Sequence, residues 1–256
     1  MRKLAWEFEV VLTYVNLQEI ISTTSTERRR SLIDRFKRLL RPGRCLIPPG
    51  EIVRQMISAH VKAPGDFDWM NVDVGMPQGF EDLMSRRDYL DEEFCTDQRI
   101  EQREVEKRFR QSLKSLRPAL DEIPVSDRPA SFEEFVTMEA DGKPLWDFGP
   151  GIYYKASGVR LADPEIKDFM KRCPPFHALC LGQTIGSYDW SLGRQQGPKN
   201  QPAGRNDLMM AVYMPYCDQF VTNDSSQREA LREVASKVQM PCQVLSFDEF
   251  AQAVSG

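Results

Sequence analysis

Residues 206–227 read NDLMMAVYMPYCDQFVTNDSSQ, and this stretch decides the fold class. Its first part, Asn206 to Met214, is apolar almost all round, which is typical of a buried helix. The run from Phe220 to Thr222 then predicts a strand that stops at Asn223-Asp224, and a helix pattern starts directly afterwards. Strands that alternate with helices in this way indicate a parallel α/β sheet.

The rest of the C-terminal part continues the alternation. The pattern predicts a helix over 225–238, a strand over 242–247 and a final short helix, which Ser246 and Glu249 open with a capping box. Before the opening stretch, the polar, glycine-rich residues 186–205 predict a loop.

The N-terminal part shows the same alternation. Residues 6–13 predict a buried strand, and a helix with a basic outer face follows, opened by a capping box of Thr24 and Glu27. A short strand, a Pro-Gly turn and another helix come next, within 44–60. The sequence therefore predicts the α/β class, with a parallel sheet flanked by helices.

The middle of the chain has a different character. Residues 63–80 and 118–165 are rich in proline and glycine, whereas 81–117 are highly charged with a narrow apolar stripe, which predicts an outer helix. We therefore expect a largely helical, charged insertion over 63–165, between two parts of one domain at 1–62 and 166–256.

Composition bounds the class of protein. The chain has 256 residues, of which 41% are hydrophobic, so a real core is expected and global disorder is not. The net charge of −4 argues against a simple basic coat for nucleic acid, although it fits a nuclease with an acidic centre. Six cysteines without a C-x-x-C pair predict reduced thiols in the cytoplasm, and no run predicts a membrane helix or a signal peptide.

Three acidic residues are candidates for the site, because ligands bind at the carboxyl ends of parallel strands. Glu19 follows the first predicted strand, Asp207 starts the buried helix, and Asp224 follows the strand that ends at Thr222. Carboxylates gathered at such an edge suit Mg²⁺ or Mn²⁺, which prefer oxygen ligands and keep several waters.

Each candidate also has a structural interpretation. Asp224 with Gln227 makes a good N-cap pair, and one carboxylate can both cap a helix and face a metal. Asn206 or Asp207 can cap the preceding helix, and Glu19 can be an ordinary exposed residue. Thr222 can support a carboxylate or a water by hydrogen bonding, or it can be present for its β propensity.

These residues resemble the C-terminal half of a PIN-like domain, in which an Asp opens a helix and a later strand ends in a Thr-x-Asp tip. The spacing 224 − 207 = 17 fits. VVLTYVNLQEI, followed by an arginine-rich helix, is similar to the family's second strand with its acidic helix residue, here Glu19. The resemblance covers about 1–60 and 165–256. It implies a metal-dependent ribonuclease in which Glu19, Asp207 and Asp224 hold Mg²⁺ or Mn²⁺, supported by Thr222 and Asn206.

One departure from the family concerns the central strand, which normally comes first and ends in an Asp. Either VVLTYVN is that strand, with Thr13 in place of the Asp, or the strand lies upstream of the sequence; we expect the second. A parallel sheet without its central strand would leave backbone groups unpaired. We therefore expect the chain as it stands to be less stable, to lack the metal site, or both.

The partners expected follow from the same residues. RNA is the expected substrate, and its candidate contacts are exposed basic residues of the first long helix, namely Arg28, Arg29, Arg35 and Arg38. A solvated helix face explains the same charges. A protein inhibitor of the antitoxin type is a further expected partner, a membrane is not, and the oligomeric state is open. The alternative function is an inactive PIN-like module that binds RNA or protein; another kind of α/β protein is the third.

Overall fold

The computed structural model describes residues 8–39, 45–76, 91–114, 121–137, 139–140, 143–144, 148–192 and 202–255. The chain divides into two units, one made of Met1–Ile52 with Asp73–Val105 and the other of Val53–Val72 with Glu106–Gly256. Each unit is described by itself. The segment 63–165, expected to be a separate insertion, is shared between the two units.

The first unit contains a short parallel strand pair and the helices that follow each strand. β1 (Leu12–Thr13) pairs with β2 (Cys45–Leu46), with Leu12 opposite Cys45. Helix α2 (Tyr14–Ile21) starts directly after β1, and α3 (Thr26–Leu39) packs on α2. Their buried side chains form one core with the strands: Leu12, Leu17, Ile21, Ile33, Phe36, Cys45 and Cys95.

Two N-terminal details differ from the prediction. Within the described residues the strand is confined to Leu12–Thr13, because Thr13 already caps α2: its hydroxyl accepts the Asn16 amide at 3.2 Å. The capping box of Thr24 and Glu27 is wrong, since the Arg28 amide donates to Ser25 Oγ at 3.3 Å and α3 begins at Thr26. The predicted second helix is present as α4 (Pro49–Lys62).

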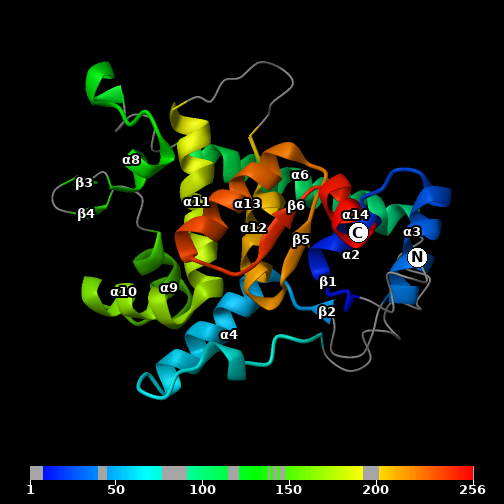
Figure 1. Cartoon of the computed structure of the whole chain (residues 1–256), viewed down its shortest axis with the longest axis horizontal. Coiled ribbons are helices and arrows are strands. Elements are labelled where there is room, and N and C mark those ends of the chain that lie inside the picture. Colours follow the sequence, from blue (N-terminus) through cyan, green and yellow to red (C-terminus); the bar gives the residue numbers. More distant parts are fainter. Residues whose placement is uncertain are drawn as a thin grey trace. The chain divides into compact units, whose positions relative to one another are not determined.

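A long central helix organises the second unit. Helix α11 (Pro174–Leu192) contacts α12 (Arg205–Met209), the 3₁₀ helix η4 (Met210–Tyr216) and α13 (Ser225–Val238), as Figure 1 shows. The contact with α12 is close, because a Cβ added to Gly182 would lie 3.0 Å from the Leu208 carbonyl oxygen. A larger residue at position 182 would therefore push α12 and its site residues away from α11.

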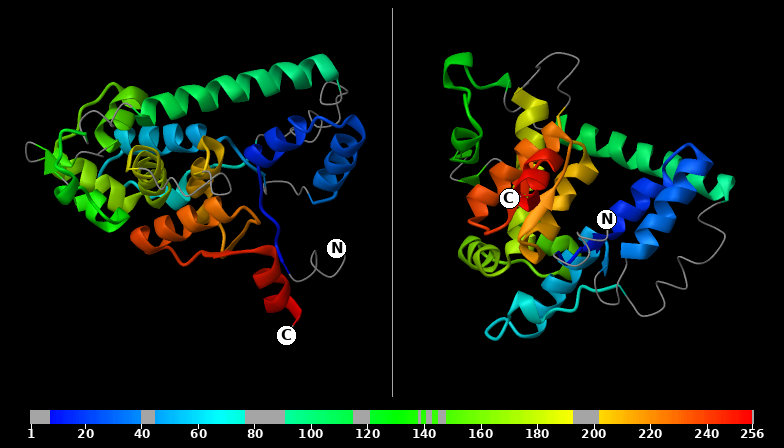
Figure 2. Two further views of the ribbon diagram at one scale, coloured as in Figure 1. Left: turned by 90° about the horizontal axis from the view of Figure 1, so that it is seen from above. Right: turned by 45° about the vertical axis from the view of Figure 1, so that its right-hand side comes forward.

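The remaining elements of the second unit surround this centre. They are η1 (Trp69–Asn71), η3 (Val125–Asp127), α8 (Phe132–Thr137), α9 (Gly149–Ser157), α10 (Asp163–Arg172), α14 (Phe247–Ser255) and a small antiparallel pair, β3 (Glu139–Ala140) with β4 (Lys143–Pro144). Helix α6 (Glu92–Lys114) begins in the first unit, ends in the second, and is one uninterrupted helix (Figure 2).

The C-terminal elements agree most fully with the predictions made from the sequence. β5 (Gln219–Val221) runs parallel to β6 (Gln243–Leu245), and α13 connects them over the predicted residues 225–238. The capping box is present, since the Glu249 amide donates to Ser246 Oγ at 3.1 Å. The loop predicted over 186–205 is wrong at its start, because α11 continues to Leu192 and buries Tyr188 against Phe135.

The described structure is thus mostly helical, with the strands arranged in pairs: β1 with β2, β5 with β6, and β3 with β4. The β1–β2 and β5–β6 pairs are parallel and their strands alternate with helices, as in the α/β class. No helix within the described residues has the length and apolar character that a membrane crossing needs.

Candidate acidic site

Asp224 lies at the junction where β5 gives way to α13. Its backbone is extended and its carboxylate Oδ1 accepts the Gln227 amide at 2.8 Å, so it is the N-cap of α13. The Asp224 amide in turn donates to Thr222 Oγ1 at 3.2 Å. The residue is exposed. The cap uses only Oδ1 and does not need the other carboxylate oxygen. Asp224 can therefore cap α13 and also face a metal ion.

Gln227 connects the junction to the neighbouring helix. Its side chain is buried, accepts the Thr222 hydroxyl at 2.6 Å and donates to the Asp207 carbonyl oxygen at 3.4 Å. Thr222 and Asp207, predicted separately as supporting and ligating residues, are therefore tied together through one side chain. The sequence indicated Gln227 only through its N-cap spacing to Asp224. Its contact with the Asp207 carbonyl, which holds α12, was not predicted.

Asp207 lies in the first turn of α12, where Oδ2 accepts the Gly204 amide at 2.8 Å. Burial raises the pKa of the Asp207 carboxyl above its ordinary value, and the nearby carboxylates of Asp224 and Glu106 raise it further, against the lowering effect of the Gly204 hydrogen bond. The charged form of Asp207 is thus destabilised by desolvation and by like charges. A cation at this place would relieve both effects.

Glu106, on α6, was not among the predicted residues, yet it belongs to this cluster. Its Oε2 accepts the Arg205 amide at 2.8 Å, and its Oε1 accepts Arg110 Nε at 2.6 Å. A Cβ added to Gly204 would lie 3.1 Å from Asp207 Oδ2 and 3.3 Å from Glu106 Oε1. Glycine at position 204 thus leaves room for two carboxylates at the start of α12. No periodicity or motif links positions 106 and 207 along the chain.

The other predicted site residues have distinct placements. Asn206 is half-buried on α12, and its Oδ1 accepts Arg205 Nη1 at 3.4 Å. Glu19 is exposed on α2 in the first unit, whereas Asp207 and Asp224 belong to the second. The structure therefore brings Asp207, Asp224 and Thr222 together within the second unit, whereas Glu19 belongs to the first unit.

The fit to Mg²⁺ or Mn²⁺ rests on the two aspartates. Mg²⁺ is commonly held by one or two carboxylates and several waters, rather than by a full cage of protein ligands. Asp207 and Asp224 offer carboxylate oxygens on adjacent elements, and their mutual repulsion is what a divalent ion would offset. Within the described residues, no group of three or more His, Cys, Asp or Glu side chains is arranged to hold a metal.

The basic face predicted for RNA has to be revised at one position. Arg28, Arg35 and Arg38 are exposed on α3, as expected for contacts with phosphate. Arg29 is fully buried: its Nη2 pairs with Glu92 Oε2 at 2.6 Å and its Nη1 donates to the Thr23 carbonyl at 2.7 Å. The prediction that Arg29 contacts RNA is wrong, because its guanidinium is enclosed and holds α3 to α6.

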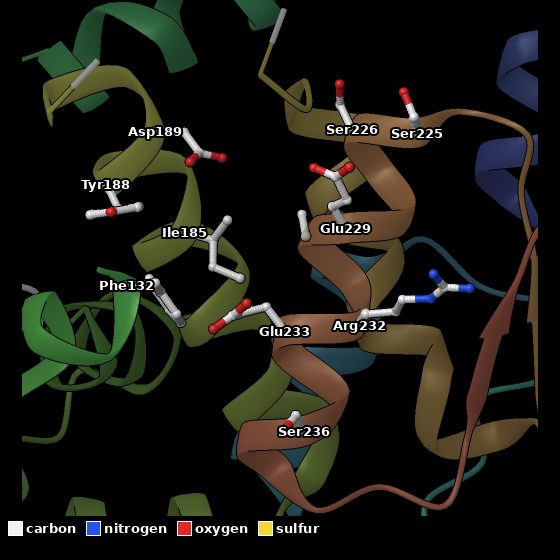
Figure 3. A pocket seen from close by; sticks show the side chains of 11 residues that line it. Phe132, Ile185, Tyr188, Asp189, Ser225, Ser226, Glu229, Arg232, Glu233 and Ser236 are labelled. Atoms are coloured by element: carbon white, nitrogen blue, oxygen red, sulfur yellow. The ribbon is translucent and has the colours of Figure 1, made fainter. Parts of the chain in front are cut away.

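A cavity of about 410 Å³ lies between α8, α11 and α13, which lines it from Ser225 to Ser236 (Figure 3). Phe132, Ile185 and Tyr188 form its apolar side, and Asp189, Glu229 and Glu233 add three carboxylates. Arg232, the one cation among the described lining residues, points toward β6 and bonds the Val244 carbonyl oxygen there and both carboxylate oxygens of Glu249 on α14. The acidic lining repels phosphate, so this cavity is a poor place for an RNA backbone.

Comparisons with known proteins give no relative: no family model matches the sequence, and no curated protein and no solved structure matches it either.

Proposed function

We propose that the chain is a PIN-like, metal-dependent ribonuclease whose acidic site is built on Asp207 and Asp224. The observation that supports this most is the pKa of Asp207, which burial and two neighbouring carboxylates raise. Carboxylates that are desolvated and repel one another contribute little to stability, and such groups concentrate at functional sites. The proposal includes one parallel sheet flanked by helices, of which β5 and β6 are part.

The roles follow from the chemistry of the side chains. Asp207 and Asp224, both in the second unit, supply oxygen ligands for Mg²⁺ or Mn²⁺. When bound, such an ion lowers the pKa of a coordinated water and offsets charge on a phosphoryl group. Thr222 and Gln227 fix the orientation of the β5–α13 junction, so that Asp224 is held while it caps the helix. The exposed Arg28, Arg35 and Arg38 attract the RNA backbone.

The test is cleavage of single-stranded RNA in Mn²⁺ by the wild type and by Asp207→Asn and Asp224→Asn. Both variants remove one negative charge and keep the shape of the side chain, and we expect at least a hundredfold loss of rate, roughly 3 kcal/mol in the barrier. Asp218→Asn is the matched control, because Asp218 is an exposed aspartate next to the other end of β5. If the wild type and the three variants cleave RNA equally fast, Asp207 and Asp224 are not residues of the catalytic site.

The second candidate is an inactive PIN-like module that binds RNA or protein. The observation that favours it is that Asp207 and Asp224 already serve as helix-capping groups. Calorimetry separates the two functions. Retained RNA binding without Mn²⁺ binding supports the module, and loss of RNA binding in Arg35→Ala together with Arg38→Ala would assign that binding to α3.

A further inference from the structure

The two cysteines that precede β5 and β6 lie side by side. Cys217 Sγ and Cys242 Sγ are 3.7 Å apart, and both cysteines are free. The strands that follow are held in register, with Gln219 opposite Gln243 and the Gln243 amide donating to the Asp218 carbonyl at 2.8 Å. Neighbouring strands lie about 4.7–4.9 Å apart, within the span that a disulfide bridges.

The two thiols differ chemically from the other cysteines of the chain. The Cys217 thiol, placed to donate to Cys242 Sγ, lowers the pKa of Cys242, while this contact and burial raise the pKa of Cys217. Burial raises the pKa of Cys45 and of Cys173 to about 12, so those thiols stay protonated and unreactive. Cys242, with Cys217 in contact, thus has the thiolate character that Cys45 and Cys173 lack.

We propose that Cys217 and Cys242 are a reversible oxidation site, at which a hydroperoxide converts the two thiols to a disulfide that fastens β5 to β6. The Cys242 thiolate attacks the peroxide oxygen, forms a sulfenic acid and releases hydroxide or alkoxide. The Cys217 thiol then attacks the sulfenyl sulfur and gives its proton to the S–O oxygen, which leaves as water. In total, two thiols and one hydroperoxide give one disulfide and one water. The second product is another water from hydrogen peroxide, or an alcohol from an organic hydroperoxide.

The consequence concerns the strand that leads to the acidic site. Residues 218–221 run from the cysteine pair to Thr222, and Asp224 follows two residues later. A covalent link at the start of β5 restricts separation of β5 from β6, and it closes a loop that contains α13. The oxidised form should therefore exchange the backbone amides of Phe220, Thr222 and Leu245 more slowly, and its Tm should rise by roughly 5–10 °C.

The test treats the reduced, full-length protein with hydrogen peroxide and then blocks free thiols with an alkylating reagent. After trypsin digestion we expect the peptides 206–228 and 238–256 to be joined, with a mass two hydrogen atoms below their sum, and to separate on reduction. The single tryptic peptide 173–194, which carries both Cys173 and Cys180, is the internal control and should be fully alkylated when the protein is unfolded in denaturant during blocking. Cys217→Ser should give no joined peptide and no rise in Tm.

Several outcomes would overturn the proposal. Full alkylation of Cys217 and Cys242 after peroxide treatment would show that the pair does not react. Sulfinic or sulfonic acids without a joined peptide, or a disulfide between other cysteines, would show that the two sulfur atoms do not meet. If Cys217→Ser fails to fold, the peptide map of the wild type decides alone.

Discussion

Two carboxylates, Glu92 in the first unit and Asp207 in the second, lie in opposite environments. In the first unit, hydrogen bonds from Arg29 and Arg99 lower the pKa of Glu92 to about 2. In the second, burial and the carboxylates of Asp224 and Glu106 raise the pKa of Asp207. The first arrangement ties α3 to α6 and is structural. The second works against folding in the charged form, and carboxylates that are desolvated and repel one another concentrate at functional sites.

The largest expected effect breaks the structural arrangement. Arg29→Met removes a buried guanidinium together with its hydrogen bonds to Glu92 and to the Thr23 carbonyl, so the free energy of unfolding should fall more than in the variants that follow. Urea unfolding measures it. Arg28→Met, one residue earlier on the exposed face of α3, is the control and should change stability by less than about 0.5 kcal/mol. Equal effects of the two variants would remove the structural role of Arg29.

The next effect concerns the support of the acidic site. Gln227→Ala removes the bonds to Thr222 and to the Asp207 carbonyl and leaves buried polar groups unpaired, so we expect a loss of about 2 kcal/mol. Gln252→Ala, at an exposed position of α14, is the control. If the two substitutions cost the same in urea unfolding, Gln227 does not connect the junction to α12.

A smaller effect separates capping from charge at Asp224. Asp224→Ala should cost about 1 kcal/mol through loss of the N-cap bond, whereas Asn caps nearly as well as Asp, so Asp224→Asn should cost almost nothing. Thermal unfolding of the three proteins checks this. A large loss in Asp224→Asn would mean that the charge itself stabilises the fold, contrary to the contrast drawn with Glu92.

The smallest effects are two pH dependences of opposite sign. The pKa of Glu92 is lowered by folding, so its stabilisation is present above about pH 4.5 and is lost as the pH falls toward 2. The pKa of Asp207 is raised by folding, so the wild type should gain stability relative to Asp207→Asn as the pH falls through that raised pKa. Tm measured against pH for wild type, Glu92→Gln and Asp207→Asn gives both profiles. Parallel profiles for the two variants would contradict the comparison.

Local signals explain which features could be predicted from the sequence. The helix over 225–238 and the Ser246–Glu249 capping box depend on residues a few positions apart, and both are confirmed. Burial of Arg29 and the approach of Glu106 to Asp207 depend on packing between segments far apart in sequence, and both were missed. The loop prediction over 186–205 was wrong at its start, because the polar residues there concealed the end of α11, which buries Tyr188.

We propose that the Asp207–Asp224 pair binds a divalent cation. Calorimetric titration of Mn²⁺ into the wild type, Asp224→Asn and the control Asp218→Asn tests it directly, because Asn preserves the cap. The account predicts binding to the wild type and to Asp218→Asn, with affinity lower by about tenfold or more in Asp224→Asn at unchanged Tm. Equal Mn²⁺ affinity in all three proteins, or no binding to the wild type, would contradict it.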